Sequence, residues 1–194
     1  MEQKRLLKSQ RIKSYFLDAA KNMIISEGVE SVSVRKVADE AGYSFVTLYN
    51  HYTDLNALLW DVKQTMINDL IEFMQKGIQD TAMDIEGIKK IFRLYIAYYL
   101  KHPNVFKFFY FHKLKRPEFS SEDPDGQYYN AMMKETFASL VLEGKIREQD
   151  IEVVGKTCIY TVHGILTLYL SGNGDMTEES ICSELDKTID YLIL

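Results

Sequence analysis

Cysteine and histidine are scarce in this chain, and their scarcity excludes several kinds of site. The 194 residues include two Cys and four His. Cys158 and Cys182 are too few for a disulfide framework or a Cys-rich zinc site. We interpret them as small buried side chains in a reducing compartment rather than as a redox switch. The histidines are spread widely along the chain, at His51, His102, His112 and His163. We therefore expect no metal and no cofactor.

Catalytic signatures and long apolar runs are also missing from the sequence. Neither Cys has an evident base beside it, and there is no nucleophile elbow, phosphate-binding loop or zinc-ligand spacing. We therefore expect no enzymatic activity. The N-terminus lacks the apolar run of a signal peptide, and no stretch of about 18 apolar residues predicts a membrane span. The sequence thus predicts a cytoplasmic protein with no membrane partner.

Helix-breaking residues are few, which bounds the fold class. Three Pro and ten Gly, with almost no polar low-complexity sequence, favour helices throughout. Hydrophobic residues make up 46% and charged residues 26%, as in an ordinary soluble domain rather than a disordered chain. The sequence predicts an all-α protein of about nine helices.

Positive charge is concentrated at the N-terminus, although the whole chain carries −5. Residues 1–52 hold eight Lys and Arg against six Asp and Glu (+2), whereas residues 53–194 hold fifteen against twenty-two (−7). This asymmetry favours a small DNA-binding head ahead of an acidic sensor body. The first thirteen residues carry only Glu2 against five basic side chains, Lys4, Arg5, Lys8, Arg11 and Lys13. This basic arm is either a solvated tail or an arm that contacts phosphates or the minor groove.

The stretch Ser33–Leu59 predicts two short helices joined by a glycine turn. Ser33 occupies an N-cap position, and Gly42 follows the last periodic residue, where a left-handed conformation ends many helices. The first helix has one apolar face formed by Val34, Val37, Ala38 and Ala41. Ser44 can cap a second helix over Phe45–Tyr52, in which Leu48 and Tyr52 face inward. This is a helix-turn-helix, which places its second helix in the DNA major groove.

The second helix resembles the recognition segment of TetR-family transcriptional regulators. The resemblance lies in G-Y-S-F-V-T-L-Y-N-H-Y, with matches at Gly42, Tyr43, Ser44, Thr47, Leu48, Tyr49, His51 and Tyr52. It implies a ligand-responsive regulator, a repressor, that binds double-stranded operator DNA as a homodimer. It also implies DNA contacts from Ser33, Arg35, Lys36, Ser44, Phe45, Val46, Thr47, Tyr49, Asn50 and His51. The chain departs from the family at Leu55, where a phosphate-contacting Lys is usual.

The other helices follow from apolar spacing and from helix-breaking residues. A first helix is expected over Arg11–Ser26, ahead of the helix-turn-helix, and a loop over residues 114–126. The remaining expected helices are Leu55–Gln75, Ile85–Lys101, Asn104–Lys113, a seventh that Gly144 closes, Glu148–Leu170 and Glu178–Leu194. The segment Asn104–Lys113 is apolar on nearly every side and is expected to be buried all round. We place the DNA-binding domain at residues 1–53 and the ligand-binding and dimerisation domain at residues 54–194.

The body carries more aromatic and Met side chains than apolar spacing requires. Ordinary core packing explains most of them, yet Tyr and His have polar tips that need partners when buried. A largely apolar pocket for a small molecule is the alternative. By the resemblance, its candidate residues are Tyr95, Tyr98, Tyr99, Phe109, His112, Tyr128, Met132, Met133, Phe137 and His163.

The last two helices are expected to form the interface of the homodimer. Their apolar seams exceed what the core of one chain needs. The candidate interface residues are Cys158, Val162, Ile165, Leu166, Leu185 and Ile189. Two alternatives stay open: a DNA-binding protein controlled by a protein partner or by no ligand, and an all-α enzyme or adaptor with a fortuitous helix-turn-helix.

Overall fold

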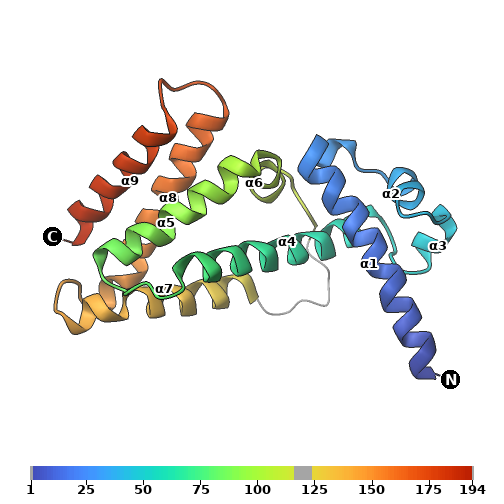
Figure 1. Ribbon diagram of the computed structural model, residues 1–194, viewed down its shortest axis with the longest axis horizontal. Coiled ribbons are helices and arrows are strands. Elements are labelled where there is room, and N and C mark those ends of the chain that lie inside the picture. Colours follow the sequence, from blue (N-terminus) through green and yellow to red (C-terminus); the bar gives the residue numbers. More distant parts are fainter. Residues whose placement is uncertain (1, 116–123, 194) are drawn as a thin grey trace. The chain divides into compact units, whose positions relative to one another are not determined.

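The computed structural model describes residues 2–115 and 124–193, with side chains described from 3–115 and 132–193. Over these residues the chain is helical without a strand, which confirms the all-α prediction (Figure 1). Two short 3-10 turns, Val29–Ser31 and Glu148–Asp150, separate longer elements. The α-helices are α1 Glu2–Glu27, α2 Val34–Glu40, α3 Phe45–Tyr49, α4 Leu55–Ile78, α5 Ile85–Lys101, α6 Pro103–Tyr110, α7 Pro124–Leu142, α8 Ile151–Leu170 and α9 Glu178–Ile193.

Several helix ends differ from their predicted positions. Helix α1 begins nine residues before Arg11, so the basic arm is helical rather than an extended tail. Helix α3 ends at Tyr49 instead of Tyr52, although backbone bonds to the Leu48 carbonyl continue the turn through Tyr52. Residues 116–123 of the predicted loop lie outside the described residues. The last three residues of that loop are helical, because Pro124 opens α7.

Helix α6 is not buried all round, and that prediction was wrong. It ends at Tyr110, three residues before Lys113. Val105, Phe106 and Phe108 are buried, whereas Phe111, just beyond the helix, is 63% exposed. Such a short helix lies against α1 along one face only, so its remaining aromatic side chains stay in contact with solvent.

The chain divides into two compact units, and the first contains the helix-turn-helix. This first unit comprises Met1–Ile71 and His102–Ser120. Helix α1 crosses it and packs on α2 and α6. Two ion pairs link α1 to α4, Lys13–Asp61 at 3.5 Å and Lys21–Asp69. Because both pairs are eight residues apart on each helix, α1 and α4 run in the same direction.

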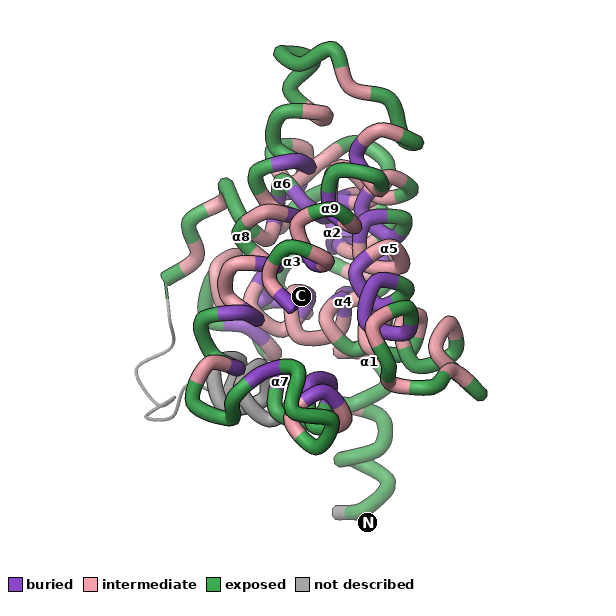
Figure 2. Tube along the Cα trace, turned by 90° about the vertical axis from the view of Figure 1, so that its left-hand side faces the viewer, coloured by how far each residue is buried: buried purple, intermediate pink, exposed green. Residues whose placement is uncertain are grey.

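The second unit comprises Glu72–Lys101 and Ser121–Leu194 and packs α5, α7, α8 and α9 together. Ion pairs join α5 to α9: Lys89 lies 2.7 Å from Asp190, and Arg93 forms a bidentate pair with Asp186. From the first pair to the second, the residue number rises along α5 (from 89 to 93) and falls along α9 (from 190 to 186), so these two helices are antiparallel. Figure 2 shows buried positions recurring along α5.

Helix α8 carries the longest apolar stretch of the described chain. Within Glu148–Leu170, a window of 18 residues has a mean hydropathy of 1.3, so this helix is long and apolar enough to cross a membrane by length and composition alone. This stretch was not singled out from the sequence. In the structure one stripe of the helix is buried inside the unit, at Val154, Cys158, Val162, Ile165 and Leu166. Burial in a protein core accounts for that stripe.

The predicted dimer-interface residues belong to the core of the second unit. Cys158, Val162, Leu166, Leu185 and Ile189 are fully buried, and Ile165 is nearly so. The apolar periodicity of α8 and α9 identifies the buried stripes correctly, but it describes how the two helices pack on each other and on α5. A second copy of the chain would have to bind the outward side chains of these helices.

Candidate nucleic-acid interface

Helix α3 presents an apolar surface to solvent. Its N-terminus is capped by Ser44, whose Oγ accepts a hydrogen bond of 3.2 Å from the Thr47 backbone N–H. Leu48 points inward and is fully buried, which fixes the rotation of the helix. Phe45, Val46 and Tyr49 are 47%, 56% and 52% exposed. Large apolar side chains held at such exposure mark an interaction surface.

Helix α2 and the turn position α3 as the sequence predicted. The Oγ of Ser33 accepts from the Lys36 backbone N–H at 3.3 Å, and Val37 and Ala38 are buried. Gly42 has φ = +74°, a left-handed conformation that glycine adopts at little cost. The rings of Tyr43 and Phe16 then meet edge to face, 5.5 Å apart. These contacts fix α3 against α1 within the first unit.

The predicted DNA contacts lie together in the first unit, with two qualifications. The hydroxyl oxygens of Ser33 and Ser44 accept hydrogen bonds from the backbone N–H groups that they cap. Only the remaining hydrogen-bonding capacity of each hydroxyl is left for DNA. The guanidinium of Arg35 lies over the ring of Phe45, 5.9 Å from its centroid. Arg35, Lys36, Phe45, Val46, Tyr49 and Asn50 are exposed.

His51 faces α1 rather than the outer side of α3. Its ring lies 6.1 Å from that of Phe16, and its Nδ1 is 3.4 Å from the hydroxyl of Ser9. The sequence predicted His51 among the outward residues because the expected helix continued to Tyr52. Since α3 ends at Tyr49, the chain turns there and carries His51 back toward α1.

Tyr52 is buried in the first unit, just after α3. Its ring is 4% exposed, and the ammonium of Lys13 lies over it at 4.8 Å. Burial raises the pKa of the Tyr52 phenol, and the nearby carboxylate of Asp61 raises it further. The phenol is therefore protonated at neutral pH.

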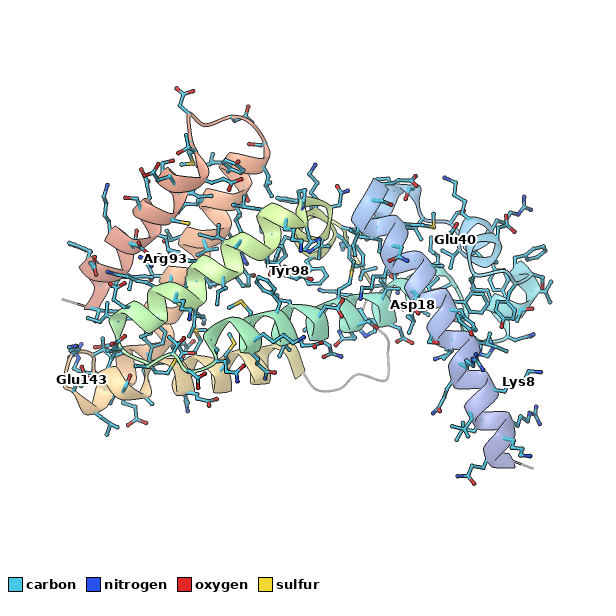
Figure 3. The ribbon with its side chains drawn as sticks, viewed as in Figure 1. Lys8, Asp18, Glu40, Arg93, Tyr98 and Glu143 are labelled. Carbon is cyan, nitrogen blue, oxygen red and sulfur yellow. The ribbon has the colours of Figure 1, made fainter. Side chains whose placement is uncertain are left out.

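Four of the predicted ligand residues in the second unit, Tyr95, Tyr98, Tyr99 and His163, form an aromatic cluster. The hydroxyl of Tyr95 is 2.9 Å from Nε2 of His163, and Tyr95 packs edge to face on Tyr99. Tyr98 packs on Tyr99 and on Phe73 of α4 (Figure 3 labels Tyr98). Met133 and Phe137 of α7 are buried, whereas Met132 is partly exposed.

Two other predicted ligand residues have their contacts within the first unit. Phe109 and His112 belong to the first unit. The ring of Phe109 lies under the ammonium of Lys63 at 5.7 Å, and Nδ1 of His112 is 3.9 Å from a carboxylate oxygen of Glu30. The side chain of Tyr128 lies outside the described residues.

The protonation of His163 is strongly changed by its surroundings. Burial lowers its pKa from 6.5 to about 4. The imidazole is therefore neutral at physiological pH, and its contact with the Tyr95 hydroxyl is a hydrogen bond between neutral groups. A charged group buried beside this neutral pair would lack a partner.

The pKa of His163 leads to a prediction about stability. As the pH falls from 6.5 toward 4, the unfolded chain binds a proton at this residue that the folded chain does not bind, so the folded state loses stability. The full shift corresponds to about 3 kcal/mol, and since water still reaches part of the ring we expect a loss of about 1–2 kcal/mol. Urea unfolding across this pH range measures it.

The matched variant is His163→Gln, which retains hydrogen bonding to Tyr95 but does not titrate. Its free energy of unfolding should fall less steeply with pH than that of the wild type over the same window. Parallel curves for the two proteins would show that His163 does not contribute.

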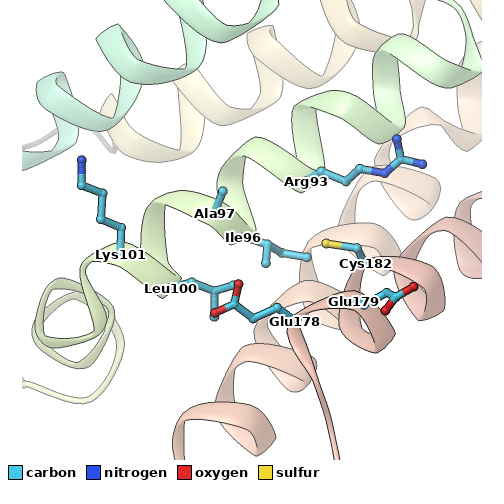
Figure 4. Close-up of a pocket in the computed structure, with 8 residues that line it drawn as sticks. All are labelled: Arg93, Ile96, Ala97, Leu100, Lys101, Glu178, Glu179 and Cys182. Atoms are coloured by element: carbon cyan, nitrogen blue, oxygen red, sulfur yellow. The ribbon is translucent and has the colours of Figure 1, made fainter.

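An open pocket in the second unit lies apart from the aromatic cluster. It has a volume of about 530 Å³ and lies between α5 and the start of α9. Its walls include Arg93, Cys182, Glu178 and Glu179, and Lys101 at its rim points away from the two glutamates (Figure 4). None of the predicted ligand residues lines it, and Arg93 is already paired with Asp186.

The cysteines and acidic side chains show no reactive arrangement among the described residues. Burial raises the pKa of the Cys158 thiol to about 11, and burial also raises that of Cys182. Both thiols are therefore protonated and weakly nucleophilic at neutral pH. Among the side chains described, those of residues 3–115 and 132–193, no group of three or more His, Cys, Asp or Glu could hold a metal ion.

Comparisons with known proteins agree with this geometry. Residues 16–61 match the model of the tetR family of bacterial regulatory proteins. No curated relative matches the sequence significantly.

Solved structures extend the likeness to the whole fold. A TetR-family transcription regulator from Marinobacter aquaeolei VT8 has 20% identity and a TM-score of 0.67, covering 98% of this chain and 97% of its own. RolR in complex with resorcinol has 12% identity and a TM-score of 0.71, covering 96% and 89%. FadR from Bacillus subtilis in complex with stearoyl-CoA has 16% identity and a TM-score of 0.70, covering 93% and 97%.

The family match covers the buried Phe16, both capped helices and the first turns of α4, which are the parts that build the exposed surface of α3. Beyond residue 61 the solved structures show the fold. Residues 16–61 thus match the tetR family of bacterial regulatory proteins, and the nine α-helices of the described residues have the fold of solved TetR-family regulators.

Proposed function

We propose that the protein is a cytoplasmic, ligand-responsive repressor that binds a palindromic operator as a homodimer. The observation that carries this proposal is the exposed surface of α3. Phe45, Val46 and Tyr49 are held in solvent by a helix whose cap and buried Leu48 leave it little freedom. A rigid, exposed second helix is what major-groove recognition requires.

Each exposed side chain of the interface has a contact that its chemistry favours. Asn50 suits a bidentate pair with adenine, and Val46 suits a thymine methyl group. Thr47 is also suited to a thymine methyl, with its hydroxyl engaged by Ser44 at 2.9 Å. Arg35 can reach a guanine edge if it leaves the face of Phe45. Tyr49 and Lys36 are left for the sugar-phosphate backbone, whereas His51 faces α1 and the hydroxyl of Ser33 caps α2.

The ligand is proposed to be a mainly apolar small molecule bound at the aromatic cluster of the second unit. The neutral Tyr95–His163 pair and the rings of Tyr98 and Tyr99 support this. RolR with resorcinol and FadR with stearoyl-CoA have similar folds, which supports a ligand-binding body. Helix α4 belongs to both units, so a ligand that favours one position of α4 would change the DNA affinity of the head.

Selection from random duplex DNA tests this function first. We expect an enriched palindrome with two half-sites, because a symmetric dimer presents two copies of α3. Failure to enrich any sequence would contradict the proposal. A thermal-shift screen of apolar compounds then tests the ligand, since a compound that binds the folded state raises the melting temperature. Added ligand should also release the selected operator.

Leu55 allows a separate prediction about the phosphate backbone. It is the first residue of α4, beside the Asp54 cap, and it is partly exposed. Leu55→Lys should raise DNA affinity and steepen its dependence on salt by about 0.9 in log–log slope if the new ammonium neutralises one phosphate. Leu55→Gln is the uncharged control. An unchanged slope in the Lys variant would show that this position does not reach the backbone.

A further inference from the structure

The first two turns of α1 carry three basic side chains that the rest of the described chain leaves unpaired. We call residues 3–8 the α1 extension. Lys4, Arg5 and Lys8 are exposed, and none of them forms an ion pair with a described residue. The next two basic residues differ: Arg11 donates to the Tyr15 hydroxyl at 3.0 Å, and Lys13 pairs with Asp61.

These charges lie where a helix in isolation disfavours them. The N-terminus of a helix carries the positive end of its dipole, so cations in the first two turns are unfavourable there. Lys4 and Lys8 are four residues apart, and Arg5 and Lys8 three apart, so like charges are neighbours on the helix surface. Both repulsions would be relieved by a polyanion bound along this surface.

The position of α1 directs the extension past the recognition helix. Toward its middle, α1 contacts both ends of the segment that contains α3, through Tyr15 with Tyr43 and through Ser9 with His51. Arg5 lies one helical turn before Ser9, on the same side of α1. The extension therefore continues beyond His51, and Figure 3 marks Lys8 on this part of the helix.

The two faces of the extension differ in character. Lys4, Lys8 and Arg11 follow one another at spacings of four and three, which places them on one stripe. Leu6, 59% exposed, lies away from that stripe, whereas Leu7, also 59% exposed, borders it, three residues after Lys4 and four before Arg11. The basic stripe continues to Tyr15, which stacks on Tyr43 in the turn just before α3. The charged face is thus the one that shares a side with the helix-turn-helix.

We propose that the α1 extension is a second DNA-binding element, a rigid basic helix that binds the phosphate backbone flanking the half-site read by α3. This inference rests on the proposed DNA-binding function. We assign these contacts to phosphates, because Lys and Arg at these spacings follow a line of charge and the major groove of the half-site is assigned to α3. The extension therefore adds affinity and salt dependence without adding sequence specificity.

The test compares the wild type with Lys4→Gln/Arg5→Gln/Lys8→Gln on a duplex of random sequence and on an operator selected with the wild-type protein. Glutamine has a helix propensity close to that of Lys and Arg and carries no charge. The slope of log affinity against log salt should become shallower by about 0.9 for each phosphate that the variant no longer neutralises, by a similar amount on both duplexes. Lys187→Gln, an exposed lysine of the second unit, is the matched control and should leave the slope unchanged.

A second variant tests the helix itself. Two alanines inserted between Lys8 and Ser9 retain every charge but rotate the extension by about 200° relative to α3. If the extension is a rigid helix, this insertion turns its basic side chains away from the DNA. The slope of log affinity against log salt then becomes shallower, as with the triple substitution. A slope equal to that of the wild type would show a flexible arm and overturn the proposal.

The remaining outcomes separate this inference from the proposed function. A wild-type protein that binds neither duplex overturns both. A wild-type protein that binds, with a triple variant of equal slope, overturns the second element alone. Because Leu6 and Leu7 give the extension an apolar side, vesicles containing anionic lipid are tested in parallel. Binding to these vesicles that the triple substitution abolishes, without any effect on DNA, assigns the extension to membranes and overturns the proposal.

Discussion

Replacing Tyr49 or Asn50 by alanine will weaken binding of the selected operator by roughly ten- to a hundredfold for each side chain, with little change in stability. Both side chains are exposed, and Leu48, which anchors the helix, is untouched. A good contact from such a side chain contributes about 1–3 kcal/mol, and about 1.4 kcal/mol is a factor of ten. Fluorescence anisotropy with the selected operator measures the loss.

The two substitutions should differ in how they affect specificity. Loss of the Asn50 amide should relax the preference for one base pair of each half-site, whereas loss of Tyr49 should weaken binding similarly across operator variants. Tyr110→Ala is the matched control, since it removes an exposed tyrosine of the same unit from α6. Wild-type affinity in both α3 variants would show that α3 does not contact the operator.

The features that the sequence predicted well depend on residues close together in the chain. Ser33, Ser44 and Asp54 cap the helices assigned to them because an N-cap bonds to a backbone N–H two or three residues away. The bounds of α5 agree with the prediction, since the Asp84 carboxylate caps its start and Pro103 follows its end. Such signals are local and need no tertiary information.

The features that the sequence predicted poorly depend on what surrounds each helix. The α1 extension has no apolar periodicity, so its helical state follows from continuity with the anchored part of α1 and from the helix propensity of Lys, Arg, Leu and Gln. The aromatic run of α6 indicated burial, but a sequence does not reveal how much protein surface is available to cover a helix. For this reason the exposure of Tyr110 and Phe111 was not predicted.

The ligand residues show a related limit. Tyr95 and His163 are 68 positions apart and were predicted to lie together, and they form a hydrogen bond. Phe109 and His112 were predicted to join them because the resemblance places their helix at the ligand cavity, whereas by their contacts they belong to the other compact unit. Composition indicates that a body is rich in aromatic side chains, whereas their grouping depends on the packing of whole helices.

The dimer face illustrates the difference between an inward and an outward stripe. Helix α8 has its strongest apolar stripe on the side buried against the chain's own core. Its outward side carries a weaker stripe interrupted by Thr157, with Val153 and Tyr160 each 66% exposed and Leu168 47% exposed. Apolar periodicity alone therefore selected the stronger, inward stripe as the dimer interface.

Gly164 supports the outward stripe as the place where a second copy binds. A Cβ atom at this position would meet no atom within 4 Å, so the fold of one chain does not require glycine here. Gly155 differs, because a Cβ there would lie 2.8 Å from the Met133 sulfur. Glycine inside an exposed helix costs about 1 kcal/mol relative to alanine. A close approach by the equivalent helix of a second copy would explain why that cost is tolerated.

If the proposed homodimer forms through this stripe, Tyr160→Glu combined with Leu168→Glu is expected to give folded monomers. The two side chains lie eight residues apart on the outward face of α8, and in a two-fold symmetric contact each introduced carboxylate meets its counterpart or an apolar surface. Because neither side chain is in the core, the circular dichroism and melting temperature of the monomer should stay close to those of the parent chain. Glutamate at Ile165 or Leu185 would instead place a charge in the core and unfold the second unit.

Loss of the dimer should lower affinity for a palindromic operator by roughly 10²–10⁴-fold, because binding to the second half-site is no longer intramolecular. Affinity for an isolated half-site should not change, since α3 and the α1 extension are intact. Sedimentation velocity measures the oligomeric state, and Gly164→Ala provides a contrasting variant that adds a methyl group at the proposed contact but raises helix propensity. A double Glu variant that still sediments as a dimer would place the interface on another face of the molecule, and the outward stripe of α8 would then be ordinary surface.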